Sequence, residues 1–338
     1  MNFLSDNAAS ACDEVLAAVV AANAAQPQAY DADPWTARLD AVFGEFFGTE
    51  CTVFPVSTGT AANGLALAAM VPPYGAIVTH REAHIQADEC GGPEFFTGGA
   101  KLLLIDGEHG KLTPGGIAAG MAGMRGGVHQ VQPRVLSLTQ ATEAGTAYTP
   151  DELAALGEVA RERGWRLHID GARFVNALVH LGCHPGDISW RAGAAALSFG
   201  GIKNGGLSAE AIVVFDRSIA EDLRFRRKRA GQMPSKGRYL SAQLLAVIET
   251  GAALRNAAAA NAGAQRVAAE AGARLLHPVE ANEIFIGLGV HSAALHDAGF
   301  NFYDWGDAGS GEARFVVAWD TPARAIDALA AALRALPE

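Results

Sequence analysis

Short apolar runs alternate with longer amphipathic or alanine-rich segments along most of the chain. From about residue 50 to 215 the runs have the length of buried strands, and the segments between them have the length of helices. Strands are predicted over 51–56, 76–80, 101–105, 134–138, 167–170 and 194–199, and helices up to residue 70, over 113–123 and over 150–163. Strands that alternate with helices in this way form a mostly parallel sheet with helices on both faces.

The segments outside this sheet complete the predicted fold. Two helices precede it, one over 10–25 with Ser10 or Asp13 as its cap, and one over 34–47 with Pro34 in the first position. A helix over 235–256 with an alanine-rich continuation to 273 follows it. The last part has the order strand, helix, strand, strand, helix, over 284–288, 292–297, 300–305, 314–319 and 322–336. We therefore expect an α/β protein with an N-terminal segment (1–29), a large domain (30–250) and a small domain (251–338).

Composition narrows the class of protein. The chain has 338 residues, half of them apolar, which is enough for a substantial core. Its formal net charge of −10 argues against a nucleic-acid or acidic-membrane partner. The four cysteines form no Cys-x-x-Cys pair, which suits a reducing cytoplasm. No basic leader precedes Arg38 and no apolar run has the length of a bilayer span, so we expect a cytoplasmic protein without a membrane partner.

Two of the predicted strands are followed or ended by residues that are capable of catalytic chemistry. Asp170 follows a buried run, and the next strand continues into a glycine-rich turn, Gly200-Gly201-Ile202-Lys203-Asn204-Gly205. Ligands of open α/β sheets lie beyond the carboxyl ends of the strands, so Asp170 and Lys203 are expected to meet over one ligand. Pyridoxal phosphate chemistry uses this pair. The lysine forms a Schiff base with the cofactor, and the aspartate keeps the ring nitrogen protonated, so that the ring accepts electrons.

Each of these residues also has an ordinary explanation when it is taken alone. An aspartate after a strand is commonly a turn residue or a helix cap. A lysine among glycines is found in phosphate loops, but those require Gly-Lys-Ser/Thr, and Lys203 is flanked by Ile202 and Asn204. His180 and His184 suggest a metal, but no second pair of ligands accompanies them, and we expect no metal. The pair Asp170 and Lys203 together favours pyridoxal phosphate.

The same two segments resemble a known family. His168-Ile169-Asp170-Gly171-Ala172-Arg173 is similar to the signature of low-specificity threonine aldolases, which are fold-type I pyridoxal-phosphate enzymes. The segment from Phe199 to Gly205 is similar to the lysine loop of a bacterial branch described as phenylserine aldolases. The resemblance covers nearly the whole chain. It implies retro-aldol cleavage of a β-hydroxy-α-amino acid, such as threonine, allo-threonine or phenylserine, to glycine and an aldehyde.

The resemblance also implies roles for single residues. The implied catalytic residues are Lys203, Asp170, His84 and His129, with one of the two histidines as the acid or base at the substrate hydroxyl. The implied cofactor-binding residues are Thr58, Gly59, Thr60, His84, Asp170, Arg173, Lys203 and Arg229, of which the first three form a phosphate cup at a helix start. The implied substrate-binding residues are Ser5, Arg173 and Arg314, the last at the start of its strand.

Other readings of the same residues stay open. Capping by Ser57 or Thr58 explains the hydroxyls at the helix start equally well, and His129 has an alternative as a solvated loop residue. The basic run 224–229 suits a solvated helix face. The resemblance instead implies a place near the subunit boundary of a homodimer or homotetramer and near the cofactor phosphate, from which Lys228 or Arg229 could reach the site of a neighbouring subunit. An aminotransferase, a β-eliminating lyase or a non-catalytic cofactor-binding protein would use the same aspartate and lysine.

Overall fold

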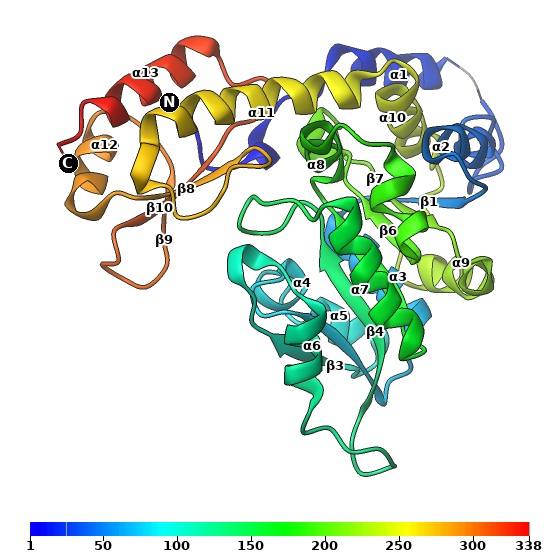
Figure 1. The fold of residues 1–338 in the computed structure, drawn as a ribbon. Helices are drawn as coiled ribbons and strands as arrows, with labels where there is room; N and C mark the ends of the chain where they lie inside the picture. Colours follow the sequence, from blue (N-terminus) through cyan, green and yellow to red (C-terminus); the bar gives the residue numbers. More distant parts are fainter. Residues whose placement is uncertain (25, 338) are drawn as a thin grey trace.

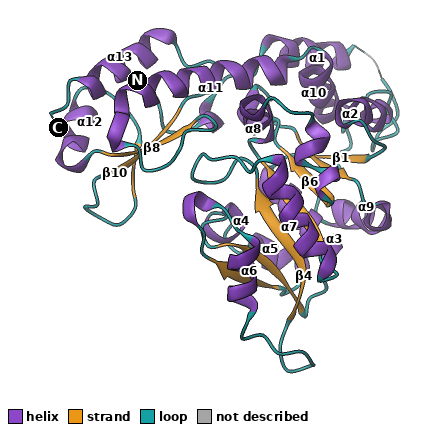
Figure 2. Cartoon of the chain, in the orientation of Figure 1, coloured by secondary structure: helices purple, strands orange, loops and turns teal. Residues whose placement is uncertain are grey.

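A seven-stranded sheet forms the centre of the molecule (Figures 1 and 2). The computed structural model describes residues 1–24 and 26–337. The strands lie in the order β1 (Thr52–Val56), β7 (Glu210–Val214), β6 (Ala194–Phe199), β5 (Arg166–Gly171), β4 (Gln132–Thr139), β2 (Gly75–His80) and β3 (Lys101–Ile105). All neighbours from β6 to β3 are parallel, whereas β7 runs antiparallel to both β6 and β1. The predicted mostly parallel sheet is confirmed.

Thirteen α-helices surround the two sheets in the described part of the chain. They are α1 (Asp13–Asn23), α2 (Leu39–Phe47), α3 (Gly59–Met70), α4 (His84–Ala87), α5 (Gly92–Thr97), α6 (Pro114–Met121), α7 (Pro150–Glu162), α8 (Phe174–Leu181), α9 (Ala220–Arg229), α10 (Arg238–Glu249), α11 (Ala252–Ala271), α12 (Ser292–Asp297) and α13 (Ala323–Arg334). Short 3-10 turns lie between several of them.

The two faces of the central sheet bury separate apolar clusters. Leu197 belongs to a cluster that takes in α2, α7, α8 and α10, and its neighbour Ala196 belongs to a cluster built on α3 and α9. Successive strand side chains point to opposite faces, so a strand that is apolar throughout can feed both clusters. This explains why a strand such as β7 contains an uninterrupted apolar run, from Ala211 to Val214.

A smaller antiparallel sheet lies at the other end of the long helix α11 (Figure 1). It consists of β8 (Glu283–Gly287), β10 (Glu312–Val316) and β9 (Tyr303–Trp305), with β10 in the middle. Its core also buries Phe3, whose carbonyl accepts the Val316 N–H at 2.8 Å. The first residues of the chain therefore pack into the core of the small C-terminal sheet.

Some predicted boundaries are wrong for identifiable reasons. The helix predicted over 235–256 is broken, because Gly251, with φ of +70°, separates α10 from α11. Pro34 lies in a turn before a 3-10 turn (Thr36–Arg38), and the Asp33 carboxylate caps this turn through the Thr36 N–H at 2.9 Å. The first helix starts at Asp13 after Cys12, which makes no side-chain cap, and its predicted end at residue 25 lies outside the described residues.

We propose residue 251 as the boundary between the large and the small domain, as the sequence predicts. The left-handed glycine at this point and the separate core of the small sheet support the division. Residue 338, the predicted end of the small domain, lies outside the described residues. In the described part of the chain, no helix combines the length and the apolar character that a membrane span requires.

Candidate active site

A cavity of about 270 Å³ lies at the carboxyl edge of the central sheet. Asp170, at the end of β5, and Lys203, in the 3-10 turn after β6, both line it. Other predicted site residues that line it are Thr58, Gly59, Thr60, His84 and Arg173. The structure thus brings these seven predicted residues together, because parallel neighbouring strands end at the same edge.

Asp170 is buried, with hydrogen-bond donors on both carboxylate oxygens. Oδ2 accepts from Nδ2 of Asn63 at 2.7 Å, and Oδ1 accepts from the Ala172 N–H at 3.0 Å. The Asn63 amide comes from α3 and donates to Glu89 Oε1 as well, at 2.8 Å. These donors hold the carboxylate in one orientation at the floor of the cavity.

The loop with Lys203 is fixed from two sides. The Glu210 carboxylate accepts the N–H groups of Gly201 and Ile202, at 3.0 and 3.3 Å. Burial raises the pKa of Glu210 to about 7. A side chain at Gly200 would place its Cβ 2.2 Å from the Ala172 carbonyl oxygen, so only glycine fits between this loop and the Asp170 loop.

Thr58 to Thr60 form the start of α3. The Thr58 hydroxyl accepts the Ala61 N–H at 3.1 Å, so the alternative capping role of this residue is observed. The first N–H groups of any helix lack partners within the helix, and together with the helix dipole they attract anions. Gly59 and Thr60 therefore present an anion-binding surface at the same cavity.

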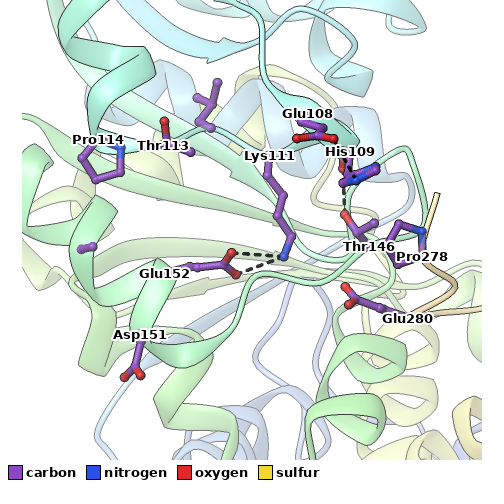
Figure 3. Close-up of a pocket in the computed structure, with 12 residues that line it drawn as sticks. Glu108, His109, Lys111, Thr113, Pro114, Thr146, Asp151, Glu152, Pro278 and Glu280 are labelled. Carbon is purple, nitrogen blue, oxygen red and sulfur yellow. Dashed lines mark hydrogen bonds and ion pairs between the residues drawn. The ribbon is translucent and has the colours of Figure 1, made fainter. Parts of the chain in front are cut away.

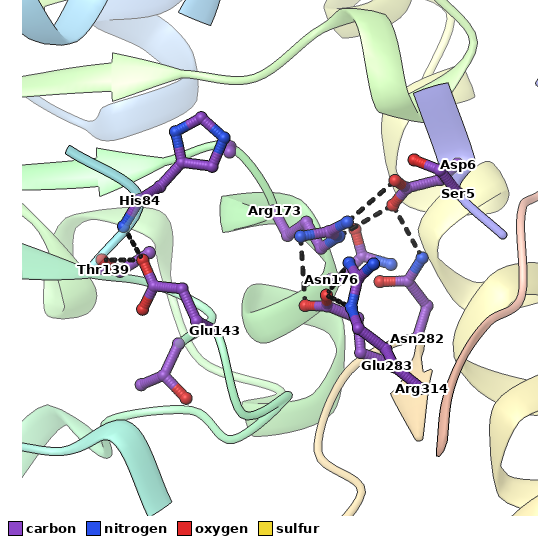
Figure 4. A network of polar contacts seen from close by, with 12 residues as sticks. Ser5, Asp6, His84, Thr139, Glu143, Arg173, Asn176, Asn282, Glu283 and Arg314 are labelled. Carbon is purple, nitrogen blue, oxygen red and sulfur yellow. Dashed lines mark hydrogen bonds and ion pairs between the residues drawn. The ribbon is translucent and has the colours of Figure 1, made fainter. Parts of the chain in front are cut away.

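His84 contacts two acidic residues, Glu89 and Glu143, and Figure 4 shows the second of them. Its ring Nδ1 lies 2.9 Å from Glu89 Oε1, and its backbone N–H donates to Glu143 Oε1 at 2.7 Å. The hydrogen bond to Glu89 raises the pKa of His84 above its ordinary value, although the partial burial of the ring opposes this shift. The imidazole is therefore biased towards its charged form.

The donor set of this cavity fits pyridoxal phosphate. A lysine for the aldehyde, a buried carboxylate for the ring nitrogen and a helix start for the phosphate all face one space of about 270 Å³. The half-exposed imidazole of His84 lies at the same space and offers a flat surface for a ring. No feature of the lining residues conflicts with this cofactor.

A second polar network links Arg173 to the N-terminal segment and the small domain (Figure 4). Arg173 donates to both oxygens of Asp6 at 2.8 Å and pairs with Glu283 at 3.1 Å. Burial opposes the charge of Arg173, but the Asp6 and Glu283 carboxylates raise its pKa. In return, Arg173 and Lys203 outweigh the burial of Asp6 and lower its pKa to about 2. Glu283 also accepts from Arg314 at 2.6 Å.

This network corrects two predicted substrate contacts. Arg314 is the third residue of β10, not its first, and its guanidinium is held by Glu283 outside the lining of the cavity. The Ser5 hydroxyl caps a 3-10 turn through the Asn7 N–H at 3.1 Å, and Asn7 lines the cavity in its place. The network pairs charged side chains that are far apart in the sequence, so the sequence pattern does not reveal these ion pairs.

His129 and Arg229 also lie away from the cavity. His129 is exposed and precedes β4, whose opposite end, at Thr139, lines the cavity. It therefore stands at the amino edge of the sheet, and its predicted place in the site of this chain is wrong. Arg229 is the exposed last residue of α9 and does not line the cavity either.

The predicted site residues do not include several polar residues that line the cavity. They are Asn7, Asn63, Glu89, Thr139, Glu143, Ser198 and Glu210. Asn63 and Glu210 had a detectable signal, because each is a polar residue inside an apolar run. A larger cavity of about 530 Å³ lies elsewhere, next to the Lys111–Glu152 ion pair, and contains none of the predicted site residues (Figure 3).

Comparisons with known proteins identify the family of this chain. The family profile described as "Beta-eliminating lyase" matches residues 2–289. The chain belongs to this family. Within it, this lyase is 46% identical to a "Low specificity L-threonine aldolase" from Pseudomonas sp. (strain NCIMB 10558), over 99% of the chain and 97% of the relative. A Pseudomonas aeruginosa protein of the same description is also 46% identical, over 98% and 96% of the two chains.

Solved structures show the same relationship for this lyase. Leishmania major threonine aldolase superposes with a TM-score of 0.92 at 25% identity, over 98% of both chains. A Thermus thermophilus aspartate aminotransferase, at 13% identity, shares the fold with a TM-score of 0.72 over 98% of this chain and 90% of that one. The predicted fold-type I architecture, the threonine aldolase family and pyridoxal phosphate as cofactor are confirmed, and the chain is a lyase.

Proposed function

We propose that this lyase cleaves L-threonine, allo-threonine and phenylserine between Cα and Cβ, and releases glycine and an aldehyde. One observation carries the proposal: Asp170 and Lys203 face one cavity in a chain that is 46% identical to low-specificity L-threonine aldolases. Bound pyridoxal phosphate supplies the electron sink for the broken bond. The remaining work, which is binding, orientation and proton transfer, belongs to the side chains of this protein.

Three groups are proposed to hold the cofactor. Lys203 binds its aldehyde carbon, and Asp170 holds a proton on the ring nitrogen, because a buried carboxylate favours a cation beside it. The start of α3, at Thr58–Thr60, binds the phosphate. The Glu210 carboxylate holds the loop of Lys203 through two backbone N–H groups, and so it fixes where the lysine amine lies.

Arg173 is proposed to bind the substrate carboxylate. It is the buried guanidinium that lines the cavity, and Asp6 and Glu283 fix its orientation. A guanidinium held in this way offers a planar set of donors to a carboxylate. Binding the carboxylate orients the Cα–Cβ bond relative to the cofactor. This orientation decides that the Cα–Cβ bond breaks and that the other bonds at Cα do not. Arg314 is proposed to act through Glu283.

The active form is proposed to be a homodimer or homotetramer in the cytoplasm. Phe95 and Phe225 are 80% and 69% exposed, and the second lies on α9 with the basic run that the sequence analysis singled out. Large exposed apolar side chains are typical of surfaces that another subunit covers. All four cysteines are free, which suits a reducing compartment. Light scattering tests the assembly, and an active monomer would contradict it.

A substrate panel tests the reaction. The four stereoisomers of threonine and phenylserine are incubated with the cofactor-loaded protein, and aldehyde, glycine, keto acid and ammonia are measured. We expect aldehyde and glycine in equal amounts. Keto acid would indicate an aminotransferase, and ammonia would indicate β-elimination.

The place of the cofactor is tested separately. Borohydride reduction followed by peptide mapping should find the cofactor on Lys203, and Lys203→Ala should lose it. Attachment to Lys101, Lys111, Lys228 or Lys236 would contradict the assignment.

A further inference from the structure

Glu143 is a carboxyl group in the cavity with one oxygen left unused. It follows β4, in a loop that begins at Gln140, and Oε1 accepts both the His84 N–H at 2.7 Å and the Thr139 hydroxyl at 2.8 Å (Figure 4). Oε2 is shielded from solvent and has no hydrogen-bond partner among the described residues. An unsatisfied buried oxygen costs free energy, so its presence at a site indicates a partner that arrives with the ligand.

The surroundings of Glu143 make it a proton acceptor at neutral pH. Burial raises the pKa of its carboxyl to about 7, and the nearby Asp170 carboxylate acts in the same direction. The His84 N–H and the Thr139 hydroxyl oppose this shift by stabilising the charged form. A group that is half ionised near the working pH is suited to both accepting and releasing a proton.

The other candidates near the cavity are already engaged. Both oxygens of Asp170 accept hydrogen bonds from protein groups. Nδ1 of His84 is engaged with Glu89, and the raised pKa of the ring keeps more of it in the protonated form, which cannot accept a further proton. His129, the other predicted base, lies at the opposite edge of the sheet. Glu89 also lines the cavity with an unpaired Oε2, but its Oε1 lies against the ring of His84, whose raised pKa favours the charged imidazole. Glu143 is the lining carboxyl that has an unpaired oxygen and no cationic side chain among its hydrogen-bond partners in the described part of the chain.

We propose that Glu143 is the catalytic base that removes the proton of the substrate β-hydroxyl through Oε2. This inference rests on the proposed retro-aldol function. As the proton moves to Oε2, the O–H electron pair becomes the second bond of the aldehyde C=O, and the Cα–Cβ pair leaves with Cα. Cα takes up one proton to give glycine, and Glu143 releases its proton to water, so the reaction requires no oxidant or reductant.

Glu143→Gln separates this role from a structural one. The glutamine oxygen can still accept from His84 and Thr139, but the amide nitrogen that replaces Oε2 cannot accept a proton. Aldehyde release from threonine should fall by about 10²- to 10⁴-fold, the usual contribution of a general base. Exchange of the α-hydrogen of glycine in D2O should stay close to the wild-type rate, because glycine has no hydroxyl. The dissociation constant of glycine should also stay unchanged.

The pH dependence provides a second readout. In the wild type, kcat/KM should rise with pH through about 7, because the base must be ionised, and this limb should be absent in Glu143→Gln. A third readout does not depend on activity. In the cofactor-free full chain with ¹³C-labelled glutamate, the carboxyl resonance that Glu143→Gln removes should titrate near pH 7.

The matched control is Glu280→Gln. Glu280 also accepts a backbone N–H of the same loop, that of Ala147 at 2.7 Å, but it lines the other cavity (Figure 3). This variant should keep wild-type aldehyde release and the wild-type pH limb. The inference is overturned if Glu143→Gln retains either of them, or if it loses glycine exchange in proportion to cleavage. A wild-type protein that releases no aldehyde from any substrate would instead reject the proposed function.

Discussion

Asp170 gives the clearest case of one residue whose charge, and not its shape, is expected to matter. It is buried, its two oxygens are held by Asn63 and the Ala172 N–H, and it lines the cavity with Lys203. In the proposed function, the negative charge at this place stabilises a proton on the ring nitrogen of the cofactor. Replacing the charge by a neutral amide of the same size isolates the electrostatic contribution.

Asp170→Asn should therefore load with cofactor but cleave poorly. Lys203 and the start of α3 remain to hold the cofactor, whereas aldehyde release should fall by about 10²- to 10³-fold, as for the loss of one strong electrostatic contact. The measurement is aldehyde release from protein with a verified cofactor content. Asp151→Asn is the control, because Asp151 is exposed on α7 and far from the lining residues. Near-normal release by Asp170→Asn would assign the ring nitrogen to another partner.

His168 shows how the same strand carries a purely structural ionisable group. Its two ring nitrogens lie 2.9 and 3.1 Å from the hydroxyls of Ser137 and Ser198, on the neighbouring strands β4 and β6. It is fully buried, and burial lowers its pKa from 6.5 to about 4, against the opposing effect of Asp170. The neutral ring suits this place, because one nitrogen donates and the other accepts.

The buried His168 should make stability fall as the pH drops. Between pH 6.5 and 4 the unfolded chain binds a proton at this histidine and the folded chain does not, so protonation favours unfolding. Relative to His168→Gln, the cofactor-free wild type should lose about 3 kcal/mol of unfolding free energy across this window. Urea unfolding of the wild type and of His168→Gln at several pH values measures this difference. Glu143 and Glu210 titrate in both proteins, so their contributions cancel. A difference that does not change with pH would contradict the buried neutral ring.

The residues that could be predicted from the sequence share a local signature. Asp170 and Lys203 stand where apolar runs end, and Thr58–Thr60 stand between a strand and a helix. Glu143 has no such signature. It was not among the predicted site residues, and its unpaired oxygen is seen only in the structure, where its carboxyl accepts from the His84 N–H and the Thr139 hydroxyl. Burial and partners distant in sequence, which set its pKa, are properties of the fold.

At the scale of elements, α7 is fixed by the cap at its start and by close packing at one glycine in its middle. Thr149 and Glu152 form a capping box at its start, which explains why this helix boundary was predicted well. Gly157, in its middle, faces the 3-10 turn Trp190–Ala192, and a Cβ there would lie 1.8 Å from the Ala192 carbonyl oxygen. Close packing against this turn, and not helix propensity, requires the glycine.

Gly157→Ala should destabilise the protein although alanine favours helices. The added methyl group forces α7 away from the turn, which should cost about 1–3 kcal/mol, as for other overpacked sites. Gly115→Ala in α6 is the matched control, because a Cβ there meets nothing within 4 Å, and it should stabilise by about 0.5 kcal/mol. Urea unfolding measures both. Equal effects of the two substitutions would mean that α7 does not pack as described.

The boundaries of three elements were predicted to the residue. The strands Lys101–Ile105 and Ala194–Phe199 and the helix Ser292–Asp297 begin and end at the predicted residues. The break between α10 and α11 was missed because the alanine-rich sequence is helical on both sides, and one left-handed glycine, Gly251, makes the turn. Its conformation depends on the packing of both helices, which the sequence pattern does not contain.

At the scale of the whole molecule, one buried charge network joins three parts of the chain. Asp6 comes from the N-terminal segment, Arg173 from the turn between β5 and α8 in the large domain, and Glu283 and Arg314 from the small sheet. Two carboxylates and two guanidinium groups meet there, so their charges sum to zero. Because Arg173 also lines the cavity, the network couples the packing of the domains to the proposed carboxylate-binding group.

Asp6→Asn should weaken the whole fold and not only the N-terminus. It leaves the buried network with an excess positive charge, which should cost about 3 kcal/mol of unfolding free energy at pH 7. The pKa of Asp6 is lowered to about 2 from 3.8, so its contribution is present above pH 3.8 and is lost as the pH falls through 2. Urea unfolding of the cofactor-free wild type and variant should therefore differ by a constant amount above about pH 4 and converge below it.

Asp13→Asn distinguishes this effect from a general loss of negative charge. Asp13 is exposed in the first turn of α1, and its substitution should change the unfolding free energy by less than about 0.5 kcal/mol at any pH. Substrate affinity gives a further check, because in Asp6→Asn an amide nitrogen replaces one acceptor oxygen, so Arg173 keeps its charge but loses one of its two hydrogen bonds to this side chain. The KM for threonine should rise in Asp6→Asn and stay unchanged in Asp13→Asn. Wild-type stability and KM in Asp6→Asn would show that Glu283 alone holds Arg173 in place.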